Sequence, residues 1–142
     1  YRPVLSVVAA LISHNDQYLV ARRSPTESHA GAWEFPGGKV EPNETLTEAL
    51  EREIQEEFGW YVACENPVGT WYHSLKDVDI ALHVLPTSFH GDAPHFEDKE
   101  LWTAKDAIAL RSLADTTPLD WLGNDEAVVD WMIQTSYLPT TK

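Results

Sequence analysis

Apolar and polar positions in the first third of the chain follow the patterns of strands and tight turns. Val4 to Ile12 is a β-branched, apolar run, and Gln17 to Ala21 continues it after the turn-forming residues His14-Asn15-Asp16. These two runs predict a β-hairpin. Polar and small residues from Ser24 to Ala32 predict an exposed loop, and Trp33-Glu34-Phe35 after it predicts a short strand.

A helix is delimited at both ends by residues of its own. Thr45 and Glu48 have the spacing of a capping box, and Gly59 can end a helix in the left-handed conformation. Between these ends an apolar residue recurs at every fourth position, at Leu46, Leu50, Ile54 and Phe58. The pattern predicts a helix between Thr45 and Gly59 with one buried face.

The second half of the chain alternates further predicted strands with two predicted helices. The strands are expected at Trp60 to Cys64, Val68 to His73 and Val78 to Leu85, followed by a loop from His90 to His95. The helices are expected at Thr103 to Leu110 and at Glu126 to Tyr137. Strands and helices mixed in one short chain favour an α/β or α+β layer fold, as a single domain over residues 1–142.

The charge balance narrows the partners that such a domain can have. Lys and Arg number 10 against 23 Asp and Glu, which gives a formal net charge of −13. This balance argues against a nucleic-acid polymer as partner, and a polyanionic small molecule needs a cation as intermediary. Cys64 is the only cysteine, so a reducing, cytoplasmic location is expected and a cysteine-based zinc site is excluded. The longest apolar run is too short to span a membrane.

Three glutamates of the predicted helix lie where solvated residues are not expected. With ~100° per residue and Leu46 at zero, Glu53 and Glu57 flank the apolar face within about 20°, and Glu56 lies near 280°. Glu48 and Glu51 fall on the opposite, solvated face. Carboxylates packed beside a buried stripe cost several kcal/mol unless they are paired or bind a metal. We therefore expect a hard divalent cation, Mg²⁺ with Mn²⁺ as substitute, which prefers oxygen ligands.

A recognisable motif contains these glutamates. From Gly38 through Glu44 and Arg52 to Trp60, the chain matches G-x5-E-x7-R-E-U-x-E-E-x-G-U, with U apolar, at every defined position. The motif and the preceding Trp33-Glu34-Phe35-Pro36-Gly37 resemble the Nudix hydrolases, in particular the MutT type and the bacterial CTP pyrophosphohydrolases. This resemblance implies a Nudix fold, an α/β/α sandwich with a central mixed sheet.

The resemblance also implies a metal site and its catalytic residues. The metal ligands would be the Gly37 carbonyl and the carboxylates of Glu53, Glu56, Glu57 and Glu97. Arg52 would orient the glutamates through charge-assisted hydrogen bonds, and Glu44 would tie the loop to the helix. Either Glu53 or Glu97 would deprotonate the attacking water, and the sequence does not choose between them.

The substrate residues carried over from the family are Arg23, Phe35, Gly38, Lys39 and Asp125. Asp125 has two equally weighted interpretations: it contacts the base, or it caps the last helix. An ionised aspartate only accepts hydrogen bonds, which suits the amino group of cytosine, whereas a protonated one can also donate.

The expected activity is hydrolysis of a nucleoside or deoxynucleoside triphosphate to the monophosphate and pyrophosphate. Cytidine triphosphates are the first expectation for the substrate, with nucleotide-pool sanitation of 8-oxo-dGTP as a close second. A Nudix module that binds nucleotides without hydrolysing them ranks lower, because such modules lack glutamates of the motif and this chain has all of them. The expected partner is a small-molecule nucleotide, and the assembly is a monomer or a homodimer.

Overall fold

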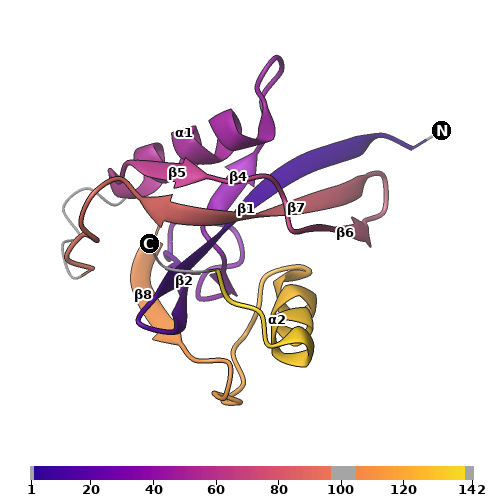
Figure 1. Ribbon diagram of the computed structural model, residues 1–142. Helices are drawn as coiled ribbons and strands as arrows, with labels where there is room; N and C mark the ends of the chain where they lie inside the picture. The colour runs from indigo at the N-terminus through magenta and orange to yellow at the C-terminus, as the bar shows by residue number, and fades with distance from the viewer. Residues whose placement is uncertain (1, 97–104, 140–142) are drawn as a thin grey trace.

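The computed structural model describes residues 2–96 and 105–139, and within them two helices and eight strands form (Figure 1). The helices are α1 (Leu46–Phe58) and α2 (Asp125–Thr135). The strands are β1 (Val4–His14), β2 (Gln17–Arg23), β3 (Trp33–Glu34), β4 (Gly37–Lys39), β5 (Val62–Cys64), β6 (Gly69–Ser74), β7 (Asp79–Phe89) and β8 (Lys105–Arg111).

β1 organises the sheet. It pairs in parallel with β7 from Val4 opposite Asp79 to Ile12 opposite Thr87, and it pairs antiparallel with β4 and β2. β5 and β6 add to β7, and β3 and β8 add to β2, all antiparallel. One parallel pair among antiparallel ones makes the sheet mixed, as expected.

The predicted hairpin between β1 and β2 is confirmed. Asn15 and Asp16 both have positive φ, 51° and 61°, so both residues of the turn have the left-handed conformation that a type I′ turn requires. Asparagine and aspartate adopt this conformation more readily than most residues with a Cβ. The turn residues noted in the sequence therefore account for the tight reversal of the chain.

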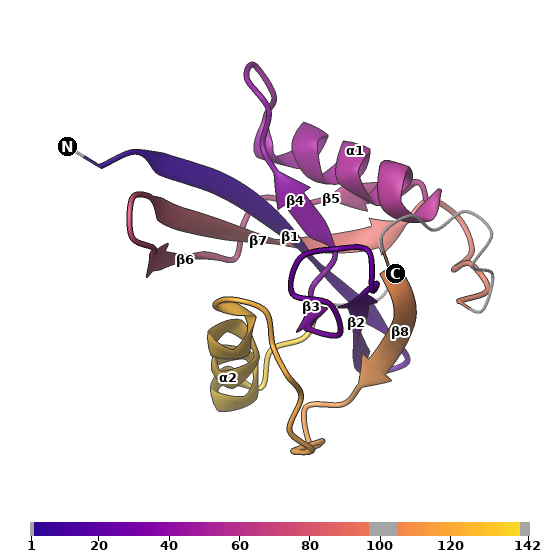
Figure 2. The same cartoon turned by 180° about the vertical axis from the view of Figure 1, so that it is seen from behind.

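The sheet separates two hydrophobic cores, one under each helix. α1 lies over one face and α2 lies against the other, as the two opposite views show (Figures 1 and 2). Along β1, Val8 and Ala10 belong to the core of α1, whereas Ala9 and Leu11 belong to the core of α2. Successive strand side chains point to opposite faces, so one apolar run fills both cores. This arrangement confirms the predicted α/β/α sandwich.

The two helices begin and end close to the predicted residues. The Thr45 side chain accepts a hydrogen bond from the Glu48 backbone, and the Glu48 carboxylate accepts one from the Thr45 backbone, so the capping box is complete. Gly59 ends α1 with φ of 72°. α2 begins at Asp125, one residue before the prediction, and buries Val128 and Met132. No helix among the described residues is long and apolar enough to cross a membrane.

The helix predicted from Thr103 to Leu110 is wrong where the structure describes it. Lys105–Arg111 is strand β8, which pairs antiparallel with β2. Its alanines and leucine favour a helix locally. However, Ile108 and Leu110 pack against the core of α1 while Ala109 packs against the core of α2, which is the period of a strand. Tertiary pairing with β2 thus overrides local helix propensity. Thr103 lies outside the described residues.

We predict that Phe58→Ala destabilises the protein by about 3–5 kcal/mol, the usual cost of removing a fully buried aromatic side chain. Phe58 is fully buried at the end of α1, with its ring stacked on that of Trp60 at a centroid distance of 4.5 Å. Urea unfolding of the metal-free protein measures the loss. Tyr61→Ala is the control, because Tyr61 is 69% exposed, and it should change stability by less than about 0.5 kcal/mol. Equal losses in both variants would contradict the assigned core.

Candidate active site

The loop before α1 brings backbone close to the helix carboxylates. β4 pairs with β1, placing Gly37 opposite Ala9 and Gly38 opposite Val8. A Cβ on Gly37 would collide with the Val8 backbone, and a Cβ on Gly38 would lie 2.5 Å from the carboxylate carbon of Glu53. Only glycine fits at position 37, where the clash is with backbone, whereas a side chain at position 38 would displace the Glu53 carboxylate. The absence of side chains therefore lets the Glu53 carboxylate lie directly against the loop.

The Arg52 side chain forms hydrogen bonds with several acidic side chains near the contact between β4 and α1. Its Nε donates to Glu44 at 2.7 Å, and its Nη1 donates to Glu53 at 2.9 Å and to Glu56 at 3.2 Å. Its Nη2 donates to the Lys39 carbonyl at 3.1 Å, which ties loop and helix together. The Arg52 guanidinium lowers the pKa of Glu44, whereas burial raises the pKa of Glu53 despite the same neighbour. These contacts agree with the positioning roles expected of Arg52 and Glu44.

The three glutamates of α1 differ in how far they are withdrawn from water. The side chains of Glu53 and Glu57 are 17% and 16% exposed, whereas Glu56 is 57% exposed at the rim. The Oε2 atom of Glu57 is buried and has no hydrogen-bond partner among the described residues. Burial raises the pKa of Glu57 to about 8, although Lys105 opposes the shift. An ionised Glu57 is therefore costly unless a cation accompanies it.

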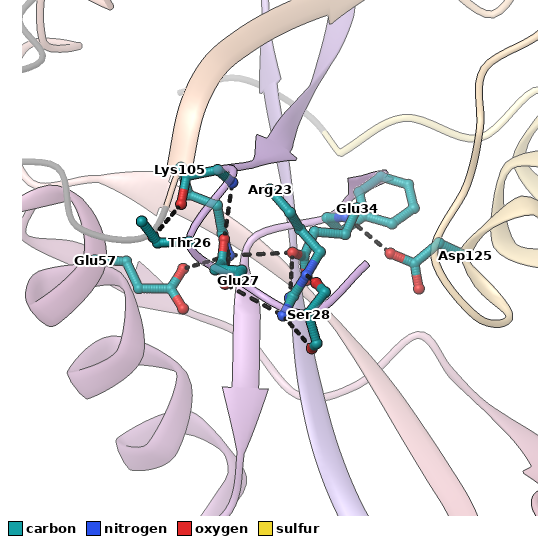
Figure 3. Close-up of polar contacts among 10 residues, drawn as sticks. Arg23, Thr26, Glu27, Ser28, Glu34, Glu57, Lys105 and Asp125 are labelled. Atoms are coloured by element: carbon teal, nitrogen blue, oxygen red, sulfur yellow. Dashed lines mark hydrogen bonds and ion pairs between the residues drawn. The ribbon is translucent and has the colours of Figure 1, made fainter. Parts of the chain in front are cut away.

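A buried lysine lies beside Glu57, as Figure 3 shows. Lys105 Nζ is 3.0 Å from Glu27 Oε2, 3.1 Å from Glu34 Oε2 and 4.0 Å from Glu57 Oε2. Arg23 pairs with two of these three acids, at 2.8 Å to Glu34 and at 3.3 Å to Glu27. Sequence reasoning missed Lys105, Glu27 and Glu34. Glu27 and Lys105 are 78 positions apart, and Lys105 had been assigned to a helix.

Arg23, expected to contact the substrate, is engaged inside the protein. Besides its two glutamates, its Nε donates to the Ser28 carbonyl at 2.7 Å. Its guanidinium thus holds the loop between β2 and β3. Lys39 has an exposed side chain, and its carbonyl is the acceptor for Arg52.

A cavity of about 540 Å³ lies beside Gly37 and Gly38 of β4, between β1, β7 and the segment before α2. Its lining includes Gly37, Gly38, Phe35, Trp121 and Asp125. The rings of Phe35 and Trp121 are stacked, with a centroid distance of 6.2 Å and an interplanar angle of 28°. The volume lies in the range of pockets for nucleotide-sized ligands. Trp121 forms part of the cavity wall and also packs against the core of α2.

Asp125 is the buried acid of this cavity. Its Oδ2 accepts a hydrogen bond from the Phe35 backbone N–H at 2.8 Å (Figure 3). Burial raises the pKa of Asp125 to about 7 despite this hydrogen bond. The expectation that Asp125 caps α2 is wrong: Asn124 occupies the N-cap position, and it makes no side-chain capping bond. Asp125 is instead the first residue of the helix, and its carboxylate binds the backbone of Phe35, the residue after β3.

The site residues expected from the sequence thus lie around one junction. Gly37, Gly38, Arg52, Glu53 and Glu57 are brought together, Glu56 lies at the rim, and Phe35 and Asp125 lie in the adjoining cavity. Within residues 2–96 and 105–139, no three His, Cys, Asp or Glu side chains converge closely enough to hold a metal ion. Glu97, expected as a further ligand, lies outside the described residues.

Comparison with known proteins gives sequence relatives along most of the chain. The NUDIX domain profile matches residues 2–131. The chain is 36% identical over 113 residues to a CTP pyrophosphohydrolase from Escherichia coli, covering 78% of this chain and 84% of that protein. It is 43% identical over 81 residues to an 8-oxo-dGTP diphosphatase from Proteus vulgaris, covering 55% and 70% respectively.

Solved structures show the same fold. The ORF135 protein of E. coli superposes with a TM-score of 0.78 at 27% identity, over 95% of this chain and 92% of that one. The MutT protein from Methanosarcina mazei superposes with a TM-score of 0.75 at 24% identity, over 95% and 96%. With the domain match over residues 2–131, these findings show that the chain belongs to the Nudix family and is a hydrolase.

Proposed function

We propose that the enzyme hydrolyses a nucleoside triphosphate to the monophosphate and pyrophosphate with the aid of a divalent metal ion, and that it prefers cytidine triphosphates. One juxtaposition carries the proposal. Gly38 lies against the Glu53 carboxylate of α1, and both Gly37 and Gly38 line the Asp125 cavity. A nucleotide can therefore place its base in the cavity and its phosphates at the glutamates.

The proposed metal ligands are Glu53, Glu56 and Glu57 with the Gly37 carbonyl, and Glu97 from outside the described residues. The unpartnered, buried Oε2 of Glu57 and its raised pKa fit a cation at this position. The donors are all oxygens, the type that Mg²⁺ and Mn²⁺ prefer. Nudix hydrolases generally use such ions. When bound, the metal would neutralise phosphate charge and make water a better nucleophile.

The protein's own groups would then position the reaction. Arg52 holds Glu53 and Glu56 through charge-assisted hydrogen bonds, which fixes the direction of their oxygens. Glu53 is one candidate to take the proton of the attacking water, because burial has raised its pKa toward the working range of a general base. Glu97 is the other candidate. Water is proposed to attack phosphorus directly, without a phosphorylated enzyme.

Asp125 supports the preference for cytosine. Phe35 N–H engages Oδ2, so Oδ1 is the oxygen proposed to accept a hydrogen bond from the base. An ionised carboxylate only accepts, and the N4 amino group of cytosine is a donor. The stacked rings of Phe35 and Trp121 supply flat apolar surface for a base. The name of the E. coli relative, a CTP pyrophosphohydrolase, agrees with this proposal.

A second candidate substrate is 8-oxo-dGTP. With a pKa of about 7, Asp125 is protonated in a sizeable fraction of molecules at neutral pH, and a carboxylic acid both donates and accepts, as an asparagine does. The P. vulgaris relative is named 8-oxo-dGTP diphosphatase. A purely binding module is the third candidate, and the complete set of motif glutamates argues against it. The assembly is proposed to be a monomer or homodimer.

We predict that exhaustive chelation abolishes hydrolysis of CTP and that added Mg²⁺ or Mn²⁺ restores it, because the carboxylates cannot bind a triphosphate without a cation. The measurement is release of CMP and pyrophosphate, with solvent ¹⁸O entering one of these two products. Activity that persists after chelation would refute the metal requirement. Initial release of diphosphate and orthophosphate would overturn the assigned reaction.

We predict that Glu57→Gln lowers kcat by at least ~10²-fold, because it removes charge from the proposed metal shell. Without metal the same variant should melt at a higher temperature than the wild type at pH 8. The pKa of Glu57 in the folded protein, about 8, exceeds its ordinary value of 4.5, so ionisation of Glu57 makes wild-type stability fall as pH rises from about 4.5 to 8. The substitution removes this slope.

Glu51→Gln is the matched control for that experiment, because Glu51 lies on the exposed face of the same helix. It should leave kcat, the melting temperature and its pH dependence nearly unchanged. Normal turnover by Glu57→Gln would show that Glu57 is not part of the site.

We predict that Asp125→Asn shifts the ratio of kcat/KM for CTP over 8-oxo-dGTP toward 8-oxo-dGTP, by ~1–3 kcal/mol for each altered hydrogen-bond pair. In the wild type this ratio should rise from pH 6 to pH 8.5 as Asp125 ionises, because its pKa is about 7. The asparagine variant should show a flatter profile. The measurement is a panel of CTP, dCTP, 5-methyl-dCTP, dGTP and 8-oxo-dGTP, and an unchanged ranking would exclude Asp125 as a base-reading residue.

A further inference from the structure

Lys105 is a cation enclosed by carboxylates from three separate parts of the chain. Its side chain is 2% exposed, and its Nζ contacts Glu27 of the β2–β3 loop, Glu34 of β3 and Glu57 of α1. Figure 3 shows the lysine reaching from β8 toward these acids. A lysine is rarely buried so completely unless it is paired. The three carboxylates around Lys105 therefore form an internal site for a positive charge.

The charges of this cluster nearly balance without any bound ion. Glu27, Glu34 and Glu57 carry three negative charges when ionised, and Lys105 and Arg23 carry two positive charges. Glu27 and Glu34 each pair with both Lys105 and Arg23, at distances of 2.8 to 3.3 Å. Glu57 is held by a longer contact of 4.0 Å, and its buried Oε2 has no hydrogen-bond partner among the described residues. Glu57 is thus the acid with capacity left for a second cation.

Lys105 and Arg52 contact different carboxylates of α1. Arg52 contacts Glu53 at 2.9 Å, and Lys105 approaches Glu57, one helical turn further on. An ammonium held inside the protein repels any divalent ion that approaches the Glu27–Glu34–Glu57 side. This repulsion would favour metal binding between Glu53 and Glu57.

We propose that the Lys105 ammonium occupies one cation position of the acidic site, so that it limits how many divalent ions the site accepts and keeps them on the Glu53 side of Glu57. The proposal rests on the proposed function, which assigns Glu57 to the metal site. It makes Lys105 a positioning residue. A purely structural ion pair would stabilise the fold equally with and without metal, which separates the two roles.

The test compares Lys105→Met with Lys105→Arg by counting bound Mn²⁺ through the electron paramagnetic resonance signal of the free ion. We expect Lys105→Met to bind about one more Mn²⁺ ion per chain than the wild type, because three carboxylates lose their internal cation. Its melting temperature should also rise with Mn²⁺ by about 3 °C more than that of the wild type. Lys105→Arg keeps the charge and should keep the wild-type stoichiometry.

Ile108→Ala controls for loss of stability, since Ile108 packs against the α1 core from the same strand. It should melt lower than the wild type but show the wild-type Mn²⁺ count. If Lys105→Met matches the wild type in Mn²⁺ count and in metal-induced melting shift, the proposal is overturned. If the wild type itself binds no Mn²⁺, the proposed function fails instead.

A measurement on the wild-type protein covers the case in which Lys105→Met does not fold. The Lys105 ammonium protons should give a slowly exchanging NMR signal, because the group is buried and paired. We expect this signal to persist at saturating Mg²⁺. Its loss to solvent exchange on Mg²⁺ addition would show that the metal displaces the lysine, and would refute the proposal.

Discussion

The burial of like charges along the inner edge of α1 is the constraint on which the rest of the site depends. Glu53 and Glu57 are one helical turn apart, and both are largely withdrawn from water. Mutual repulsion and lost hydration would expel them unless cations compensate. Arg52 beside Glu53, Lys105 beside Glu57 and the glycine backbone of β4 meet that requirement.

The sheet determines where these charged groups lie. β1 sends alternate side chains into two cores, so α1 with its acids lies on one face and α2 with Asp125 on the other. The Gly37–Gly38 backbone belongs to both surroundings: Gly38 abuts Glu53, and both glycines line the cavity of Asp125. A side chain at position 37 would collide with the β1 backbone, and one at position 38 would collide with the Glu53 carboxylate.

Local patterns predicted the parts of the molecule that local interactions determine. The capping box at Thr45, the left-handed Gly59 and the positive φ of Asn15 and Asp16 depend on residues only a few positions apart. The inward direction of Glu53 and Glu57 followed from helical periodicity alone. Strand β8 could not be predicted in this way, because its alanines and leucine favour a helix until β2 supplies a hydrogen-bonding partner.

Contacts between segments far apart in the sequence could not be predicted from local patterns either. The sequence allowed Asp125 to cap its own helix, and only the approach of β3 shows that its carboxylate binds the Phe35 N–H. Glu27 and Lys105 meet across 78 positions. That separation bears on biosynthesis: during translation, the acids of residues 27 to 57 leave the ribosome well before the lysine that neutralises them. Until β8 joins the sheet, these acids must stay hydrated, so the charged centre of the enzyme is completed only late in chain synthesis.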